Sequence, residues 1–220
     1  MRRSILPLLA GVLLCTALSG CNAHGFGYYL FKPLWTKSLP YTIDLGVSVP
    51  HIVLMEGDMS QWKYMNDVDE RAMAQTFERH FREEVNHDRH AKAGSMEGEH
   101  SIAIEAIRLQ ETARTETCEG TSYTLQRMTV KIDCIYRAPG MNKRHTITLD
   151  EMEHLRRKEK EDGVVCKVKN ARATFENLVC RGADKAYAKY GSIWHKHRKQ
   201  VAREKERAAK KAARKAKKEG

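Results

Sequence analysis

Hydrophobic and polar residues alternate most regularly between Tyr123 and Arg137. From Met128 to Tyr136 every second residue is apolar, and polar residues such as Lys131 and Asp133 fall between them. Because successive side chains of a β-strand point to opposite faces, this pattern predicts a strand with one apolar face. Weaker patterns predict shorter strands near residues 41–55, 102–109, 145–149 and 164–168.

Interruptions in these patterns indicate where the strands end or change register. Pro50 falls in the first strand region, and a proline is expected at a sheet edge because it cannot donate a backbone hydrogen bond. In the second region the apolar pattern changes phase near Ala106, which predicts a register change. Turn residues at Cys118-Glu119-Gly120 and at residues 138–142 flank the strongest strand, so a tight turn is expected on each side of it.

Two stretches follow the period of an α-helix. The first can be capped by Asp67 or Asp69 and is expected to run to about His90. The second begins near Asn170 and keeps an apolar stripe as far as Trp194. Both helices are expected to pack their apolar faces inward. In the first helix that face consists of residues spaced by four: Met73, Phe77, Phe81 and Val85.

One further segment is predicted to be helical from its first residues. Asp150 followed by Glu153 resembles a capping box, which predicts a short charged helix ending at Gly163. The elements together predict an α+β fold. In this fold a small antiparallel sheet of about four strands is covered by two helices and is followed by a basic helical C-terminal tail.

The first 20 residues have the three parts of a secretory signal. Arg2 and Arg3 supply the positive start, residues 5–17 the apolar run, and Ser19-Gly20 the small residues before a cleavage point. The apolar run of about 13 residues falls short of the roughly 20 that span a bilayer, so it is expected to be removed.

The signal ends at Leu18-Ser19-Gly20-Cys21, which resembles the lipobox of bacterial lipoproteins. The resemblance implies cleavage before Cys21 by a lipoprotein signal peptidase and attachment of lipid to the Cys21 sulfur. The residue after the cysteine is Asn22, whereas an aspartate at this position keeps a lipoprotein from reaching the outer membrane. The resemblance therefore implies a location in the outer membrane, facing the periplasm. The inner membrane and the cell surface are the alternatives. The alternative interpretations are an ordinary signal peptide with a chance cysteine and a short helix of a cytoplasmic protein.

On this interpretation the chain has four parts. They are a signal peptide over 1–20, a lipidated tether over 21–40, a periplasmic α+β domain over 41–195 and a basic tail over 196–220. The tether holds five aromatic rings between Phe26 and Trp35. These rings are expected to lie either at the level of lipid headgroups or against the domain core.

Positive charge is concentrated at the carboxyl end of the 220-residue chain, whose formal net charge is +11. Between Lys196 and Glu219, twelve Lys or Arg against three Glu give +9, and residues 21–195 are neutral. Such a composition favours helix but offers no apolar surface to bury, so a marginal, mobile helix is expected. Eight cations are the predicted contacts with an anionic surface: Arg203, Arg207, Lys210, Lys211, Arg214, Lys215, Lys217 and Lys218.

Four cysteines remain once Cys15 leaves with the signal and Cys21 takes lipid. An even number in an exported chain predicts two disulfides. Local pairing is favoured, because it closes two loops of about 15 residues each. The expected pairs are Cys118–Cys134 and Cys166–Cys180. No Cys-x-x-Cys pair or finger-type spacing occurs, so no metal is predicted.

Candidate catalytic residues are sparse. His80, Glu84 and His87 could share a side of the first helix, where a metal or proton-relay site is conceivable. Exposed residues on a charged helix face are the simpler interpretation. The sequence contains no nucleophile elbow, phosphate-binding glycine loop or His-Glu-x-x-His motif. It therefore predicts neither an enzyme nor a cofactor.

Two functions from different classes remain. The first is a structural or interaction role in the envelope, in which the basic tail binds peptidoglycan, lipopolysaccharide or anionic phospholipid. The second is an assembly cofactor that docks through its domain onto an outer-membrane protein or a wall-synthesis complex. For the second, the order of elements over 41–195 is similar to that of several small α+β envelope lipoproteins. Polybasic segments also bind nucleic acid non-specifically, but export argues against that partner.

Overall fold

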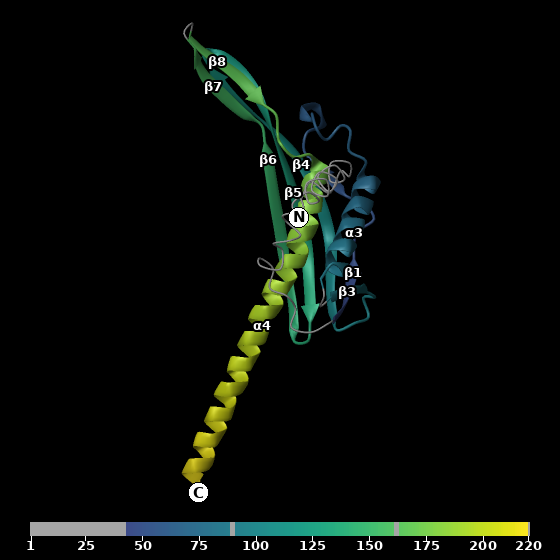
Figure 1. The fold of residues 1–220 in the computed structure, drawn as a ribbon, viewed down its shortest axis with the longest axis vertical. Helices are drawn as coiled ribbons and strands as arrows, with labels where there is room; N and C mark the ends of the chain where they lie inside the picture. Colours follow the sequence, from purple (N-terminus) through teal and green to yellow (C-terminus); the bar gives the residue numbers. More distant parts are fainter. Residues whose placement is uncertain (1–42, 89–90, 161–162, 220) are drawn as a thin grey trace, which may run out of the picture.

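The computed structural model describes residues 43–88, 91–160 and 163–219. The predicted signal peptide, Cys21 and the aromatic tether lie outside these residues. The described chain forms one sheet with two helices packed on it, and it is elongated (Figure 1). A two-stranded hairpin extends from one end of the sheet, and the carboxyl half of the last helix extends from the other.

The main sheet has six strands: β1 Ile43–Ser48, β2 Leu54–Glu56, β3 Ala91–Gly94, β4 His100–Cys118, β5 Thr121–Ala138 and β6 Met141–Met152. Its order is β3-β1-β4-β5-β6, and β2 pairs with the far part of β4. The β4–β5 and β5–β6 pairs are antiparallel, whereas β1 pairs in parallel with both β3 and β4. The α+β class is therefore confirmed. The sheet is mixed and has more strands than the four expected, because short segments before and after the first helix add parallel strands.

The hairpins of the sheet form at the predicted turns. Glu119 and Gly120 have φ values of 50° and 74°, so both central residues of the β4–β5 turn are left-handed. Two positive φ values match the right-handed twist of the flanking strands, which is why such turns close hairpins. The predicted register change is also present, because the β4–β5 pairing shifts between Ile104 and Ala106.

Two α-helices pack on the sheet. Helix α3 spans Glu70–Asn86, and the Asp69 side chain caps it by accepting a hydrogen bond from the Ala72 backbone N–H at 2.8 Å. The predicted stripe of α3 is buried, from Met73 to Val85. Helix α4 spans Phe175–Glu219 without a break. At about 1.5 Å per residue, its 45 residues extend roughly 67 Å.

The packed half of α4 lies close to β5 and β6. Gly182 permits this approach, since a Cβ atom there would fall 2.2 Å from Ile132 Cδ1. The Tyr136 hydroxyl donates a hydrogen bond to the Ala186 carbonyl at 3.1 Å, which satisfies a polar group inside the core. The core thus lies between one face of the sheet and the two helices.

The predicted helix over 150–163 is wrong. Strand β6 continues to Met152, and β7 His154–Lys160 then pairs with β8 Gly163–Lys169 in a separate antiparallel hairpin. Glu153 does not cap a helix, because its buried carboxylate is bound by other groups. Its carboxylate accepts hydrogen bonds from Lys63 Nζ, Tyr64 Oη and the Gln126 backbone N–H.

Candidate functional site

The projecting half of α4 is the candidate site for an anionic surface. Trp194 is the last buried residue of the helix as far as Arg214, and every residue from 202 to 214 is exposed. This part of α4 runs away from the sheet into solvent (Figure 1). The tail predicted as a separate, marginal helix is instead continuous with the helix that covers the sheet.

The cations of this half are grouped on one side of the helix. At 3.6 residues per turn, Arg203, Arg207, Lys210 and Arg214 fall on the same side, with Lys211 at its edge. Nearer the domain, a surface hollow of about 450 Å³ is lined by Lys196, Lys199, Gln200, Arg203, Glu204 and Arg207. Alanines such as Ala209 and Ala213 fall mainly on the other side of the helix. The basic face is defined here as Arg203, Arg207, Lys210 and Arg214.

Few carboxylates neutralise the basic face. Lys210 forms an i,i+4 ion pair with Glu206. Within residues 202–214, Arg203, Arg207, Lys211 and Arg214 form no ion pair. The other predicted contacts, Lys215, Lys217 and Lys218, lie in the last turns of α4, and their side chains are outside the described part of the structure.

A buried histidine–carboxylate pair joins the two helices. His80 on α3 and Asp184 on α4 are 6% and 5% exposed, and their Nε2 and Oδ1 atoms are 2.9 Å apart. Burial lowers the pKa of His80, but the hydrogen bond and charge of Asp184, aided by Glu84 and Glu83, outweigh burial and raise that pKa. The expectation of an exposed charged face is therefore wrong for His80 and Glu84, although His87 is exposed.

Two buried carboxylates hold the segment before α3. Glu111 accepts hydrogen bonds from three successive backbone N–H groups, those of residues 63–65, at 2.9–3.0 Å. Glu153 accepts from Lys63 Nζ and Tyr64 Oη, each at 2.6 Å. Burial raises the pKa of Glu153, but these donors outweigh burial and lower it overall. Hydrogen bonds from neighbouring groups occupy the oxygen atoms of both carboxylates. Their role is therefore to position the loop before α3. Nothing in the local sequence pattern identified them.

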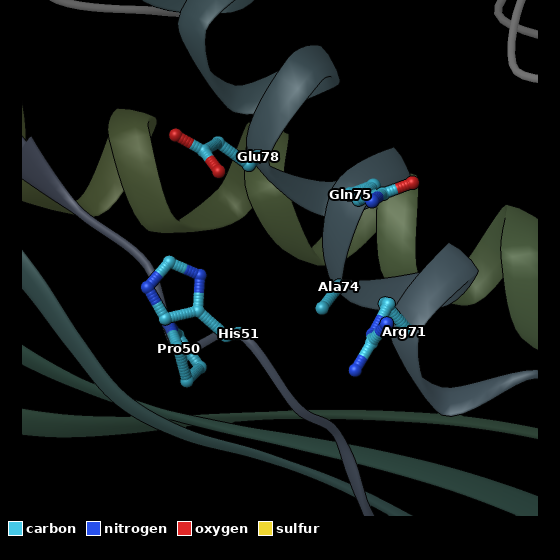
Figure 2. A pocket seen from close by; sticks show the side chains of 6 residues that line it. All are labelled: Pro50, His51, Arg71, Ala74, Gln75 and Glu78. Atoms are coloured by element: carbon cyan, nitrogen blue, oxygen red, sulfur yellow. The ribbon is translucent and has the colours of Figure 1, made fainter.

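Several hollows adjoin α3. One, of about 280 Å³, lies between Pro50-His51 and the helix, with Arg71 and Glu78 separated by Ala74 on its wall (Figure 2). It is at the lower limit for a small-molecule site. Another, of about 500 Å³, is lined by Asp67, Asp69 and Glu176 among others. Even so, the described residues include no group of three or more His, Cys, Asp or Glu that could hold a metal.

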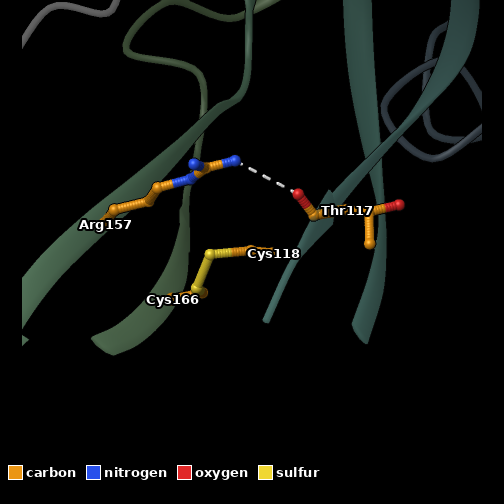
Figure 3. The surroundings of a disulfide bond; sticks show 4 residues. All are labelled: Thr117, Cys118, Arg157 and Cys166. Atoms are coloured by element: carbon orange, nitrogen blue, oxygen red, sulfur yellow. Dashed lines mark hydrogen bonds between the residues drawn. A yellow bond between two sulfur atoms is a disulfide. The ribbon is translucent and has the colours of Figure 1, made fainter. Parts of the chain in front are cut away.

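The predicted disulfide pairing is wrong. Cys118 at the end of β4 is bonded to Cys166 on β8, with their Cα atoms 6.3 Å apart (Figure 3). Cys134 is a buried free thiol within β5. Cys180 is disulfide-bonded, but not to Cys166. Local pairing fails because Cys134 faces the core below α4, whereas Cys118 lies at the far end of the hairpin, next to β8.

The predicted lipidation residue, Cys21, lies outside the described residues. Among the residues that are described, no helix combines the length and the apolar composition needed to cross a membrane.

Comparisons with known proteins do not assign the chain to a family. The sequence matches no family model and no curated protein. Among solved structures, one similar chain is a homologue of a neuraminyllactose-binding hemagglutinin from Helicobacter pylori. It is 9% identical with a TM-score of 0.35, and the similarity covers 72% of this chain and 86% of that one. At this level the similarity indicates neither a family nor a function.

Proposed function

We propose that the chain is a lipid-anchored envelope protein that binds an anionic envelope component through the projecting half of α4. The observation that carries the proposal is the basic face, a row of exposed cations on a helix that stands clear of the domain. The lipobox-like Leu18-Ser19-Gly20-Cys21 supports an envelope location for this row. The anionic component is lipopolysaccharide, anionic phospholipid or peptidoglycan.

A row of cations on one side suits an extended anionic surface. Each cation near such a surface contributes about 1 kcal/mol, and the attraction is screened beyond about 8 Å at physiological ionic strength. Insertion into lipid is not supported, because the side opposite the basic face consists largely of alanine, which buries little apolar area. Binding is therefore electrostatic and peripheral.

The test compares two variants of the full mature chain that carry Cys21→Ser, so that lipid on that residue cannot contribute. The first variant neutralises the basic face with Arg203→Gln, Arg207→Gln, Lys210→Gln and Arg214→Gln. Binding to lipopolysaccharide, anionic vesicles and purified peptidoglycan is measured over a series of salt concentrations. At least one of these should lose affinity strongly in the variant, and its salt dependence should become shallower.

The second variant keeps the composition and net charge but breaks the row. Arg203 exchanges places with Ala202 (Ala202→Arg with Arg203→Ala), and Arg207 with Ala208 (Arg207→Ala with Ala208→Arg). If the arrangement of the cations matters, this variant should bind more weakly than the natural chain. Equal binding by all three chains at every salt concentration would contradict the proposal.

A second candidate function is docking of the domain onto an envelope membrane protein, as an assembly cofactor. Large apolar side chains are exposed near β2, with Ile52 at 54%, Leu54 at 50% and Met59 at 70%. Deleting residues 196–220 separates the two functions. The deletion should abolish function if α4 carries the binding, and should leave the main complex intact if the domain does.

A further inference from the structure

The β7–β8 hairpin has a second basic surface that is distinct from α4. In an antiparallel pair, directly opposed residues point to the same face, and every second residue along a strand shares it. The register pairs His154 with Lys169 and Arg156 with Lys167. This face is named the ribbon face, and its basic residues, all exposed, are His154, Arg156, Lys158, Lys160, Lys167 and Lys169.

Like charges lie directly opposite each other on the ribbon face. Opposed cations in neighbouring strands destabilise a sheet unless carboxylates separate them. Glu159 pairs with Val164 on the other face, and over residues 154–160 and 163–169 no cation of the ribbon face forms an ion pair. Glu161 and Asp162 follow in the sequence but lie outside the described residues. Within residues 154–160 and 163–169, the ribbon face therefore concentrates cations that no carboxylate of these strands neutralises.

The other face of the hairpin is attached to the main sheet. Cys166 forms the disulfide to Cys118, and Arg157 Nη2 donates to the Thr117 carbonyl at 3.2 Å (Figure 3). Arg157 and Cys166 are opposed residues and share that face. Because the two faces of a strand pair point in opposite directions, these links fix the ribbon face toward solvent.

Apolar residues accompany the cations near the tip. Val165 is 45% exposed and lies opposite Lys158 on the ribbon face, and its neighbour Val164 is 37% exposed. No aromatic residue occurs between His154 and Lys169. Proteins that bind single-stranded nucleic acid stack bases on aromatic side chains, so the composition favours a different anionic partner.

We propose that the ribbon face binds the headgroups of an anionic lipid surface. Its cations recur about 6.8 Å apart along each strand of the hairpin, which suits an extended array of phosphates better than one small ligand. Val165 contributes apolar contact at the level of the headgroups. This surface is separate from the basic face of α4, and the two lie toward opposite ends of the molecule (Figure 1).

The test uses the full mature chain with Cys21→Ser and with the basic face of α4 neutralised as above, so that this face does not contribute and the other cations of α4 are the same in every chain compared. Binding is measured to vesicles of phosphatidylglycerol and phosphatidylcholine, to phosphatidylcholine vesicles, and to a single-stranded DNA oligomer. The ribbon variant carries Arg156→Gln with Lys167→Gln. The matched control carries Arg137→Gln with Lys143→Gln, which removes two exposed cations near the opposite end of the sheet.

The ribbon variant should bind anionic vesicles about 25-fold more weakly, since each cation near an anionic surface contributes about a fivefold factor. The control should bind as its parent does, and Val165→Asn should weaken binding with no change in charge. Thiol titration checks that Cys118–Cys166 stays intact in each variant. Equal loss in ribbon variant and control would overturn the proposal, as would tighter ribbon-dependent binding to DNA than to vesicles. Because the basic face of α4 is neutralised in every chain compared, either failure leaves the proposed role of that face untouched.

Discussion

His80 and Asp184 connect α3 to α4 through a buried hydrogen bond, with 2.9 Å between Nε2 and Oδ1, and the contact is an ion pair when His80 is protonated. Tyr187 Oη on α4 also donates a hydrogen bond to Asp88 Oδ2, just after α3, at 2.7 Å, so two polar contacts join these helices. Breaking a buried pair by removing one charge costs more than the pair contributes, because the remaining charge stays buried.

Asp184→Asn should lower the free energy of unfolding by about 3 kcal/mol when His80 is charged. The pKa of His80 is raised in the folded state, so the stabilisation is fully present below the usual value of 6.5 and is lost as the pH rises through the folded value. Urea unfolding at several pH values should therefore show a larger difference between the two chains in acid than in base. Lys185→Gln, at an exposed neighbouring position of α4, should show no such pH dependence.

Glu153→Gln should destabilise the chain by about 2 kcal/mol near neutral pH, because an amide cannot accept from all three donors. The pKa of Glu153 is lowered in the folded state. Its stabilisation is therefore present above the usual value of 4.5 and is lost as the pH falls through the folded value. Unfolding at decreasing pH should bring the variant and the natural chain together. Glu159→Gln on the exposed part of β7 is the matched control, and an equal effect there would contradict the role given to Glu153.

Gly46→Ala should destabilise the sheet by about 2 kcal/mol. A Cβ atom at Gly46 would lie 2.5 Å from the Ser95 carbonyl oxygen and 2.8 Å from Met96 Cα, and both are backbone atoms that cannot rotate away. At Gly98 the nearest atom would be 3.5 Å away, an ordinary contact, so Gly98→Ala should be close to neutral. The midpoints of urea unfolding compare the two variants directly.

Peptide mapping of the unreduced chain should join Cys118 to Cys166. The bond spans a sequence separation of 48 residues, so replacing both cysteines by serine should cost about 4 kcal/mol on the loop-entropy estimate. Burial raises the pKa of Cys134 to about 11, so its thiol should react with alkylating agents only after unfolding. A peptide joining Cys118 to Cys134 would contradict the structure.

The local patterns of the sequence were sufficient where one face of an element is buried. The alternation along β5 and the four-residue spacing in α3 come from burial against a single neighbour, and both predictions were confirmed. The prediction of a helix from Asp150 is wrong because a capping box depends only on neighbouring residues, whereas the structure of this segment depends on distant ones. The partners that bury Glu153, namely Lys63, Tyr64 and Gln126, are distant in sequence.

The two candidate surfaces also differ in how far local sequence patterns predict them. The cations of α4 form a dense run, so charge alone identified them, whereas their gathering on one side required the helix to be continuous. The sequence does not predict the ribbon face, because the capping-box pattern predicts a helix over residues 154–160, although cations alternate there at Arg156, Lys158 and Lys160. The pairing of Cys118 with Cys166 depends on where the hairpin lies in space, and no spacing rule provides that.

The unbroken course of α4 through Trp194 also sets a distance and a direction. Arg214 follows Trp194 by 20 positions, so at about 1.5 Å per residue it stands roughly 30 Å beyond the packed part of the helix. A surface held at Arg214 would be kept at that separation from the domain. A load applied to the free end would pass along the helix to Tyr190 and Trp194, whose rings are buried against the sheet. The aromatic packing at the base of the helix therefore sets the direction in which the projecting half leaves the domain.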